Sequence, residues 1–278
     1  MSDTVTGDSL TTRLRRRYHY AGLLLPAMVI TDFKLRYQAS FLGYLWTLLR
    51  PLALFSILYL VFVKLLKFGT GIPYYAIYLL FGIVIWGFFA EATGQGLGSL
   101  VARADLLRKI SFPRYVVVLS VGVSSLISFG LAMLVIVLFM VLKQVPVRMS
   151  ILWLPFLFVE LAAFSLSLAF ILSALFVRFR DMSYIWEVVL QAAFYATPIL
   201  YPLSMINNVT FKRLLLLNPM AQVIQDARYC LITDVTETMT QVYGTPWARA
   251  IPVGITIVMV VASVWFFRRE SPAFAEVA

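Results

Sequence analysis

Long hydrophobic runs alternate with short polar segments along this chain. Six runs approach or exceed the roughly 20 residues that a helix needs to cross the roughly 30 Å hydrocarbon layer of a membrane. The pattern predicts an all-α integral membrane protein with six transmembrane helices. The expected spans are residues 44–63, 73–89, 115–142, 151–177, 184–201 and 248–267.

The remaining segments are too short to fold as separate domains. We expect residues 1–43 to form a cytoplasmic tail and an interfacial helix, residues 44–267 one transmembrane domain, and residues 268–278 a second cytoplasmic tail. A group of arginines within residues 13–17 precedes a short apolar run that Pro26 interrupts. This pattern favours an uncleaved helix on the membrane surface over a signal peptide.

Positive charge indicates the orientation of the spans. An even number of spans places both termini on one side, and the segments on that side carry the larger share of Lys and Arg. Cytoplasmic loops of membrane proteins are enriched in these residues. The sequence therefore predicts a multi-pass protein of a bacterial inner or plasma membrane with both termini in the cytoplasm.

The longest predicted external segment is residues 202–247, which is not uniformly polar. Two short apolar or amphipathic pieces, residues 214–217 and 221–232, flank Asn218 and Pro219. A helix breaker between two such pieces indicates either a re-entrant helical hairpin in the outer leaflet or a pair of interfacial helices.

Composition excludes several classes of function. Hydrophobic residues make up 62% of the chain and charged residues 13%, with a formal net charge of +10. The basic residues lie between apolar spans, which argues against nucleic-acid binding. One Cys and one His leave no basis for a disulfide or for a Cys- or His-based metal site. No P-loop, zinc-protease or serine-hydrolase motif is present, so we expect no catalytic residue, no bound metal and no cofactor in this chain.

The first predicted cytoplasmic loop has the character of a docking helix. Its apolar residues Leu106, Leu107 and Ile110 share a helical face, and charged residues accompany them. Such a helix suits either a groove on a partner protein or a surface of anionic lipids. The candidate coupling residues are Leu106, Leu107, Arg108, Lys109, Ile110, Phe112 and Pro113.

Three further groups of residues are candidates for function. Asp32, Lys34, Arg36 and Tyr37 precede the first span and suit an interfacial anchor. Glu160 lies inside the fourth span, where a carboxyl group pairs with another polar group or lines a pore. Aromatic rings can stack on sugars, although interfacial belts and lipid-facing bulk are the commoner use of such rings. The candidate channel lining is Trp86, Phe88, Phe89, Glu160, Phe194 and Tyr195.

The order of several motifs resembles the permease subunits of ABC-2 type exporters of O-antigen, teichoic acid and related surface polysaccharides. The matching motifs lie in residues 32–51, 107–114, 179–181, 195–202 and 218–220. The resemblance covers about residues 20–270 and implies a homodimer with two copies of a separate ATPase, which binds ATP and Mg²⁺.

The resemblance also implies roles for individual segments. The loop from Leu106 to Pro113 would couple to the ATPase, and the interfacial helix would face it. The substrate would be a lipid-linked glycan that passes along the interface of two protomers. The external gate would include Asn218, Pro219, Gln222 and Asp226.

Three other functions remain open from the sequence. An ABC-2 exporter of drugs or lipids would share the fold, and an ion-coupled secondary transporter would rest mainly on Glu160. A membrane enzyme that acts on lipid-linked sugars would need convergent acids and a metal, which the sequence does not offer.

Overall fold

A computed structural model describes residues 22, 24–32, 34, 43–109 and 112–271. Within these ranges the chain is helical and contains no β-strand. Residues 24–32 form a helix ahead of the first long helix. The long helices are α2 (Trp46–Leu58, continued by the π-helical segment η2, Tyr59–Leu65), α3 (Tyr75–Ala102), α5 (Tyr115–Leu142), α6 (Leu154–Arg178), α7 (Met182–Ala196) and α11 (Ala250–Glu270). The short helices are η1 (Gly43–Leu45), α4 (Ala104–Lys109), η3 (Met149–Trp153), η4 (Leu203–Met205), α8 (Val209–Leu216), α9 (Pro219–Leu231), α10 (Met239–Tyr243) and η5 (Pro246–Arg249).

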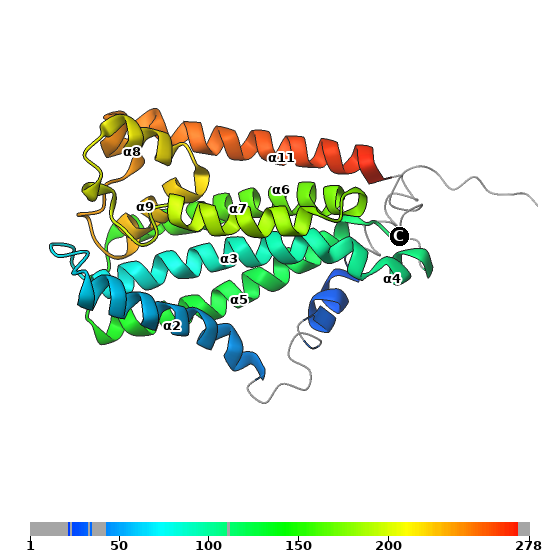
Figure 1. The fold of residues 1–278 in the computed structure, drawn as a ribbon, viewed down its shortest axis with the longest axis horizontal. Helices are drawn as coiled ribbons and strands as arrows, with labels where there is room; N and C mark the ends of the chain where they lie inside the picture. Colours follow the sequence, from blue (N-terminus) through cyan, green and yellow to red (C-terminus); the bar gives the residue numbers. More distant parts are fainter. Residues whose placement is uncertain (1–21, 23, 33, 35–42, 110–111, 272–278) are drawn as a thin grey trace, which may run out of the picture.

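Helix α3 forms the centre of the bundle, with α5 and α6 packed along it (Figure 1). Helices α2 and α7 also contact α3, while α11 packs mainly on α6. In the most apolar stretch of α3, 78% of the residues are buried, whereas in that of α2 and its continuation η2 no residue is buried. The protomer therefore has one well-covered central helix and several helices with a long exposed side.

The two ends of the bundle differ (Figure 1). One end carries α4, the helix formed by residues 24–32 and the last turn of α11, and we call it the α4 end. The other carries α8, α9 and α10, and we call it the hairpin end. The described N-terminal helix and the end of α11 thus lie at the same end of the bundle.

Five helices in the described part of the chain are long and apolar enough to cross a membrane. They correspond to the first, second, third, fourth and sixth of the predicted spans. The fifth prediction, residues 184–201, coincides with α7, which ends at Ala196 and has only 15 residues. Proline ends this helix early because Pro198 disfavours helical backbone in the residue before it, and Thr197 is extended.

The second predicted span is longer in the structure than the hydropathy pattern suggests. Helix α3 continues from Phe89 through a polar, glycine-rich stretch to Ala102. Gly96 allows this extension to pack closely, because a Cβ atom added there would lie 2.7 Å from the Cβ atom of Ala169 in α6. Gly94 and Gly98 form a G-x-x-x-G pattern. A Cβ atom added at either glycine would have no neighbouring atom within 4 Å in the described part of the chain.

This difference between neighbouring glycines predicts opposite effects of one substitution. Gly96→Ala should lower the free energy of unfolding by about 1–3 kcal/mol, because the added methyl group overpacks the α3–α6 contact. Gly94→Ala, the matched control, should raise it by about 0.5–1 kcal/mol, because alanine favours helix and the methyl group meets open space. Thermal unfolding of the two purified variants measures both effects. Equal effects would contradict the packing of α3 on α6.

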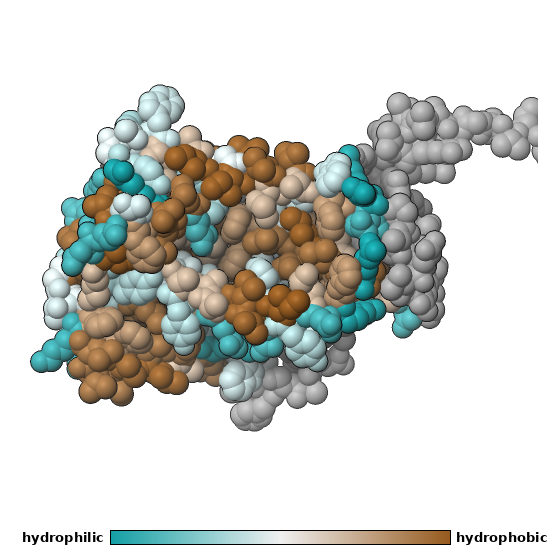
Figure 2. All heavy atoms as spheres, turned by 45° about the horizontal axis from the view of Figure 1, so that its top comes forward, coloured by the Kyte–Doolittle hydropathy of each residue, from teal (hydrophilic) through white to brown (hydrophobic). Residues whose placement is uncertain are grey.

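The outward faces of the long helices are strongly apolar. Exposed side chains include Leu138 on α5, Phe156 on α6 and Val258 on α11, each more than half exposed. Figure 2 shows such residues over the middle of one face, with hydrophilic residues gathered toward both ends. Because soluble monomers rarely expose apolar patches of this extent, the surface fits a lipid environment.

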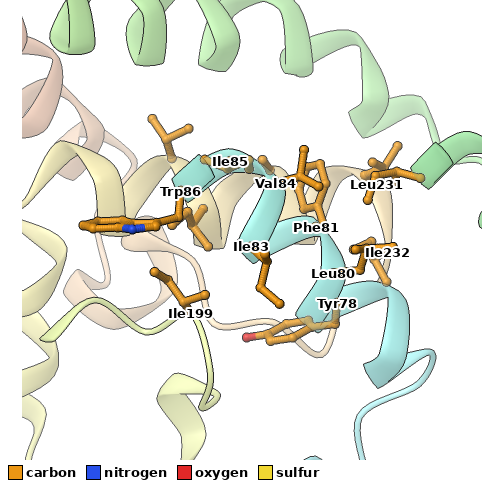
Figure 3. Packing of buried hydrophobic residues seen from close by; sticks show 14 of the residues in the cluster. Tyr78, Leu80, Phe81, Ile83, Val84, Ile85, Trp86, Ile199, Leu231 and Ile232 are labelled. Atoms are coloured by element: carbon orange, nitrogen blue, oxygen red, sulfur yellow. The ribbon is translucent and has the colours of Figure 1, made fainter. Parts of the chain in front are cut away.

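The segment expected to form either a re-entrant hairpin or two interfacial helices contains two helices, α8 and α9. Asn218 caps the start of α9, since its side-chain oxygen accepts a hydrogen bond from the backbone N–H of Met220 at 3.0 Å. Pro219 occupies the first helical position, where its missing N–H costs nothing. All of α9 except Tyr229 is buried, and α9 packs against α3, α6 and α11. Figure 3 shows Leu231 and Ile232 at the end of this segment packed near α3.

Candidate functional site

The α4 end joins three separate segments through one polar cluster. Asp32, in the helix of residues 24–32, forms a salt bridge with Arg103, which directly precedes α4. Arg103 also donates a hydrogen bond to the hydroxyl of Ser120 in α5 at 2.9 Å. The side chains of Asp32 and Arg103 are both more than four-fifths buried. Burial lowers the pKa of Arg103, and the contact with Asp32 stabilises its charge.

Apolar contacts reinforce this cluster. Leu106 and Leu107 of α4 are half-buried and pack against a cluster that includes Met28 and Leu100. Their apolar faces therefore serve the protomer's own packing as well as any partner. The same is true of Phe112, while Pro113 is buried. Asp105 of α4 is exposed.

Some predicted residues at this end cannot be placed. Arg36, Tyr37 and Ile110 lie outside the described residues, as do the side chains of Arg108 and Lys109. Lys34 is exposed. The structure thus unites Asp32 with the start of α4, while Arg103 and Ser120 were not among the predicted site residues. Their charge and hydroxyl were visible in the sequence, but their proximity was not.

The hairpin end is built around a completely buried arginine. Arg228 of α9 donates hydrogen bonds to the carbonyl oxygens of Tyr78, Pro198 and Ile199, at 3.1, 2.7 and 2.7 Å. Its guanidinium lies 3.6 Å from the centroid of the Tyr78 ring. Burial lowers the pKa of Arg228, and the tyrosines beside it oppose that shift. Arg228 therefore fastens α9 to α3 and to the turn after α7.

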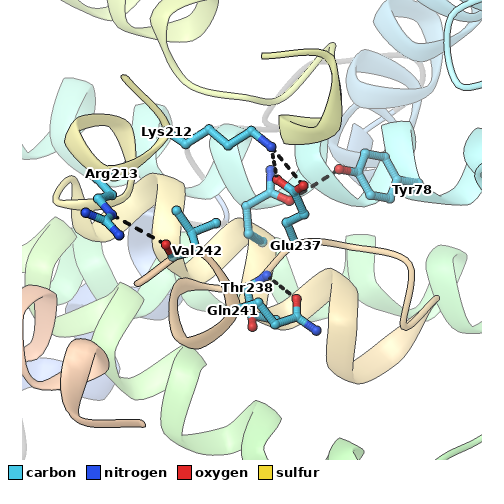
Figure 4. A network of polar contacts seen from close by, with 8 residues as sticks. Tyr78, Lys212, Arg213, Glu237, Thr238, Gln241 and Val242 are labelled. Carbon is cyan, nitrogen blue, oxygen red and sulfur yellow. Dashed lines mark hydrogen bonds and ion pairs between the residues drawn. The ribbon is translucent and has the colours of Figure 1, made fainter. Parts of the chain in front are cut away.

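Glycine makes room for this arginine. A Cβ atom at Gly82 would lie 2.3 Å from Nη2 of Arg228. A second polar link lies close by, where the Tyr78 hydroxyl donates to Oε1 of Gln225 at 3.3 Å (Figure 4). On the outer side of the hairpin, Lys212 of α8 pairs with Glu237 at 2.6 Å. Sequence analysis assigned no role to Arg228, which lies within the predicted external segment of residues 202–247.

The candidate gate residues also lie inside this end of the bundle. Gln222 and Asp226 are 1% and 0% exposed. Asp226 accepts a hydrogen bond from Gln222 at 2.8 Å and forms an ion pair with Arg249 at 2.9 Å. Burial raises the pKa of Asp226, against the effects of Arg249 and the hydrogen bonds. With Asn218 and Pro219 starting the helix, these four residues hold α9 in place within the protomer.

The aromatic candidates fall into two groups. Trp86, Phe88 and Phe89 are buried in the core of the protomer, at 8%, 3% and 5% exposure. They pack against rings of other helices, because large rings bury much apolar area. The Trp86 ring meets Phe194 edge to face, that of Phe88 is tilted against Phe129, and that of Phe89 stacks on Phe164. In this structure they are core residues of the protomer. Phe194 is half-buried against Trp86, while Tyr195 is 67% exposed.

The exposed side of helix α7 carries four polar side chains, with the exposed Ile185, Val188 and Val189 among them. Tyr184, Glu187, Gln191 and Tyr195 recur at helical spacing and are all exposed. The opposite side contacts α3, where the indole N–H of Trp186 donates to the hydroxyl of Thr93 at 3.2 Å. A glutamate and a glutamine on a helix within an apolar bundle favour water or a polar partner, because lipid does not satisfy them.

Comparison with known proteins defines the class. The family model for the ABC-2 type transporter matches residues 24–232, well over half of the chain. The chain belongs to this family of multi-pass membrane proteins.

Among its relatives is the O-antigen export system permease protein RfbA of Myxococcus xanthus, 37% identical over 76% of this chain and 80% of that protein. Two proteins of the same name from Klebsiella pneumoniae are 32% and 31% identical. These matches cover 76% and 80% of this chain and 82% and 86% of the relatives.

Proposed function

We propose that this protein is the transmembrane subunit of an ATP-driven exporter that moves a lipid-linked polysaccharide, such as O-antigen, across the bacterial inner membrane. The observation that carries the proposal is the similarity to O-antigen export permeases over most of both chains. The bundle of apolar helices and the polar cluster at the α4 end agree with it.

In this proposal the α4 end faces the cytoplasm and the hairpin end faces outward. The helix of residues 24–32, α4 and the end of α11 then share the cytoplasmic side, which requires an even number of passes. Helix α7, with the turn that follows it, supplies the sixth pass. Helix α9 re-enters the outer half of the bundle, where its backbone is buried in protein.

We further propose a homodimer that binds two copies of a cytoplasmic ATPase at the α4 end. ATP and Mg²⁺ bind the ATPase, and this chain transmits the motion. Asp32 and Arg103 tie α4 to the neighbouring helices, so a push on α4 moves them together. The polysaccharide passes along the exposed side of α7, where Tyr195 can stack on sugar rings and Gln191 can bond hydroxyl groups.

Replacing the exposed ring of Tyr195 tests whether α7 lines the path of the polysaccharide. Tyr195→Ala should lower glycan export by roughly tenfold, as expected for the loss of about 1.4 kcal/mol of interaction, with unchanged thermal stability. Trp265→Ala on α11 is the matched control, since Trp265 is 61% exposed on another helix. Export of polymer to the cell surface measures the effect. An equal loss in both variants would contradict a specific role for α7.

The composition of the native complex tests the proposal as a whole. The protein is purified in a gentle detergent, and the mass and subunits of the complex are determined. We expect two copies of this chain with two copies of an ATPase. Asp105→Arg, which reverses an exposed charge of α4, should reduce the bound ATPase while the permease stays folded. A stable particle that never contains an ATPase would refute the proposal.

A further inference from the structure

The short turn between α6 and α7 carries an exposed aromatic ring. Helix α6 ends at Arg178 and α7 begins at Met182, so residues 179–181 join them. The side chains of α6 from Glu160 to Val177 are all at least partly buried, whereas Phe179 is 53% exposed. Single exposed apolar residues are common on protein surfaces. The depth of this ring and its neighbours therefore decide what it contacts.

The Phe179 ring lies beyond the lipid-facing surface of the bundle. On α11 that surface ends after Trp265, which is 61% exposed, and gives way to the exposed Arg268. The ring of Phe267 at this border lies 5.1 Å from the ring of Phe170 in α6. Helix α6 continues from Phe170 to its end over about 12 Å, at 1.5 Å per residue. A membrane that covers the apolar faces therefore ends before it reaches Phe179.

The same turn adjoins α4. Ala174 and Val177, near the end of α6, belong to the apolar cluster against which Leu106 and Leu107 of α4 pack. The turn and α4 thus lie together at the end of the bundle where we have proposed that the ATPase binds. A protein that covers α4 therefore also comes within reach of Phe179.

Two arginines flank the exposed ring. The guanidinium of Arg178 lies 5.4 Å from the centroid of the Phe179 ring, and that of Arg180 lies 5.3 Å from the centroid of the Phe176 ring. Both distances are typical of cation–π contacts. Arg178, Arg180 and the following Asp181 are exposed. Two cations and one carboxylate around an apolar ring are complementary to an apolar pocket that is bordered by carboxylates.

Backbone hydrogen bonds hold the turn at both of its ends. The N–H of Phe179 donates to the carbonyl oxygen of Leu175 at 2.8 Å, and the N–H of Met182 donates to that of Phe179 at 3.3 Å. The N–H of Tyr184 donates to the carbonyl oxygen of Asp181 at 3.1 Å. A surface that is ordered before binding loses less conformational entropy when a partner binds. Aromatic and arginine side chains on such a surface contribute most to protein–protein affinity.

We propose that residues 178–181 form a second docking contact for the ATPase, beside α4, with Phe179 inserted into an apolar pocket whose rim carries carboxylates. The inference rests on the proposed function, since it names a further place where the same partner binds. It gives a role to the motif of residues 179–181, to which sequence analysis assigned none. Because α7 begins at this turn, the contact connects the ATPase directly to the helix that we propose lines the path of the polysaccharide.

ATPase binding by single variants tests the contact. The ATPase that copurifies with the wild type is separated and titrated back onto each purified full-length permease. Phe179→Ala should weaken binding by about tenfold or more, as the truncation of an aromatic anchor does. Phe211→Ala, the matched control, removes a ring that is 50% exposed on α8 at the hairpin end and should bind as the wild type does. Arg180→Glu should also weaken binding, by a factor that shrinks at high salt.

The accessibility of position 179 distinguishes the ATPase from lipid. The single cysteine of the chain, Cys230, is buried, so the thiol of Phe179→Cys can be labelled selectively with a water-soluble maleimide. In bilayers that contain anionic lipid, this thiol should react in the absence of the ATPase and be protected in its presence. The thiol of Phe211→Cys should react equally in both conditions.

Three results would contradict the proposal in different ways. Protection of position 179 by the bilayer alone would assign Phe179 to lipid and overturn the docking contact. Equal ATPase binding by Phe179→Ala and the wild type would overturn it too, while leaving the proposed export function intact. A wild type that never binds an ATPase would refute the proposed function, and this contact with it.

Discussion

Arg228→Ala is expected to lower the free energy of unfolding by roughly 3–5 kcal/mol, the largest effect of any single substitution at the hairpin end. The substitution removes three hydrogen bonds from a buried charged group, each worth about 1.5–3 kcal/mol before water relieves part of the loss. The Pro198 oxygen keeps its hydrogen bond from Gln225 Nε2. The substitution also removes the cation beneath the Tyr78 ring. Thermal and denaturant unfolding of the purified protein measure the change.

Two further variants make this result specific. Arg213→Ala removes an exposed arginine of α8 whose hydrogen bond to Val242 is long, at 3.5 Å, and should cost less than about 1 kcal/mol. Arg228→Lys keeps the charge but loses the planar fork that reaches several carbonyls, so its stability should fall between those of Arg228→Ala and the wild type. Equal stability of Arg228→Ala and Arg213→Ala would show that Arg228 does not hold α9.

Single changes at the Asp32–Arg103 pair are expected to reduce export strongly. Asp32→Asn and Arg103→Gln each leave a mostly buried partner without its charge, and they separate the N-terminal helix from the start of α4. A coupling free energy of about 1–3 kcal/mol between two sites, here the ATPase-binding end and the transport path, corresponds to a change of roughly 5- to 150-fold. Polymer export should fall within this range, while the bound ATPase is retained.

The reversed pair provides the decisive comparison. Asp32→Arg combined with Arg103→Asp restores opposite charges at the same two positions, and export should recover in part. Lys212→Gln breaks the salt bridge with Glu237 at the other end of the bundle and serves as the control. This variant should export polymer as the wild type does. If the double reversal exports no better than the single variants, the ion pair does not transmit motion from α4.

The sequence predicted most of the helices, because hydrophobic length is a local property. The third predicted span coincides with α5, and the break at Asn218 and Pro219 coincides with the start of α9. The end of α3 was placed too early, because its polar residues lowered the hydropathy. Its continuation depends on the contact of Gly96 with Ala169, which lies far away in the sequence.

The arrangement of side chains was less accessible from the sequence. Arg228 gains its partners from α3 and from the turn after α7, 150 and about 30 residues away. The sequence also could not show which aromatic residues are buried in the core and which are exposed. Phe89 and Tyr195 have similar surroundings along the chain, yet one is buried and the other exposed. Only the packing of α3 and α7 separates core rings from a possible lining.

The most direct test of the central claim is the location of the glycan in cells depleted of this protein. Surface polysaccharide and lipid-linked polysaccharide inside the cell are quantified before and after depletion. We expect the surface polymer to disappear and completed lipid-linked polymer to accumulate on the cytoplasmic side, with recovery on re-expression of the wild type. Unchanged surface polymer, or its loss without internal accumulation, would contradict export of a lipid-linked polysaccharide by this protein.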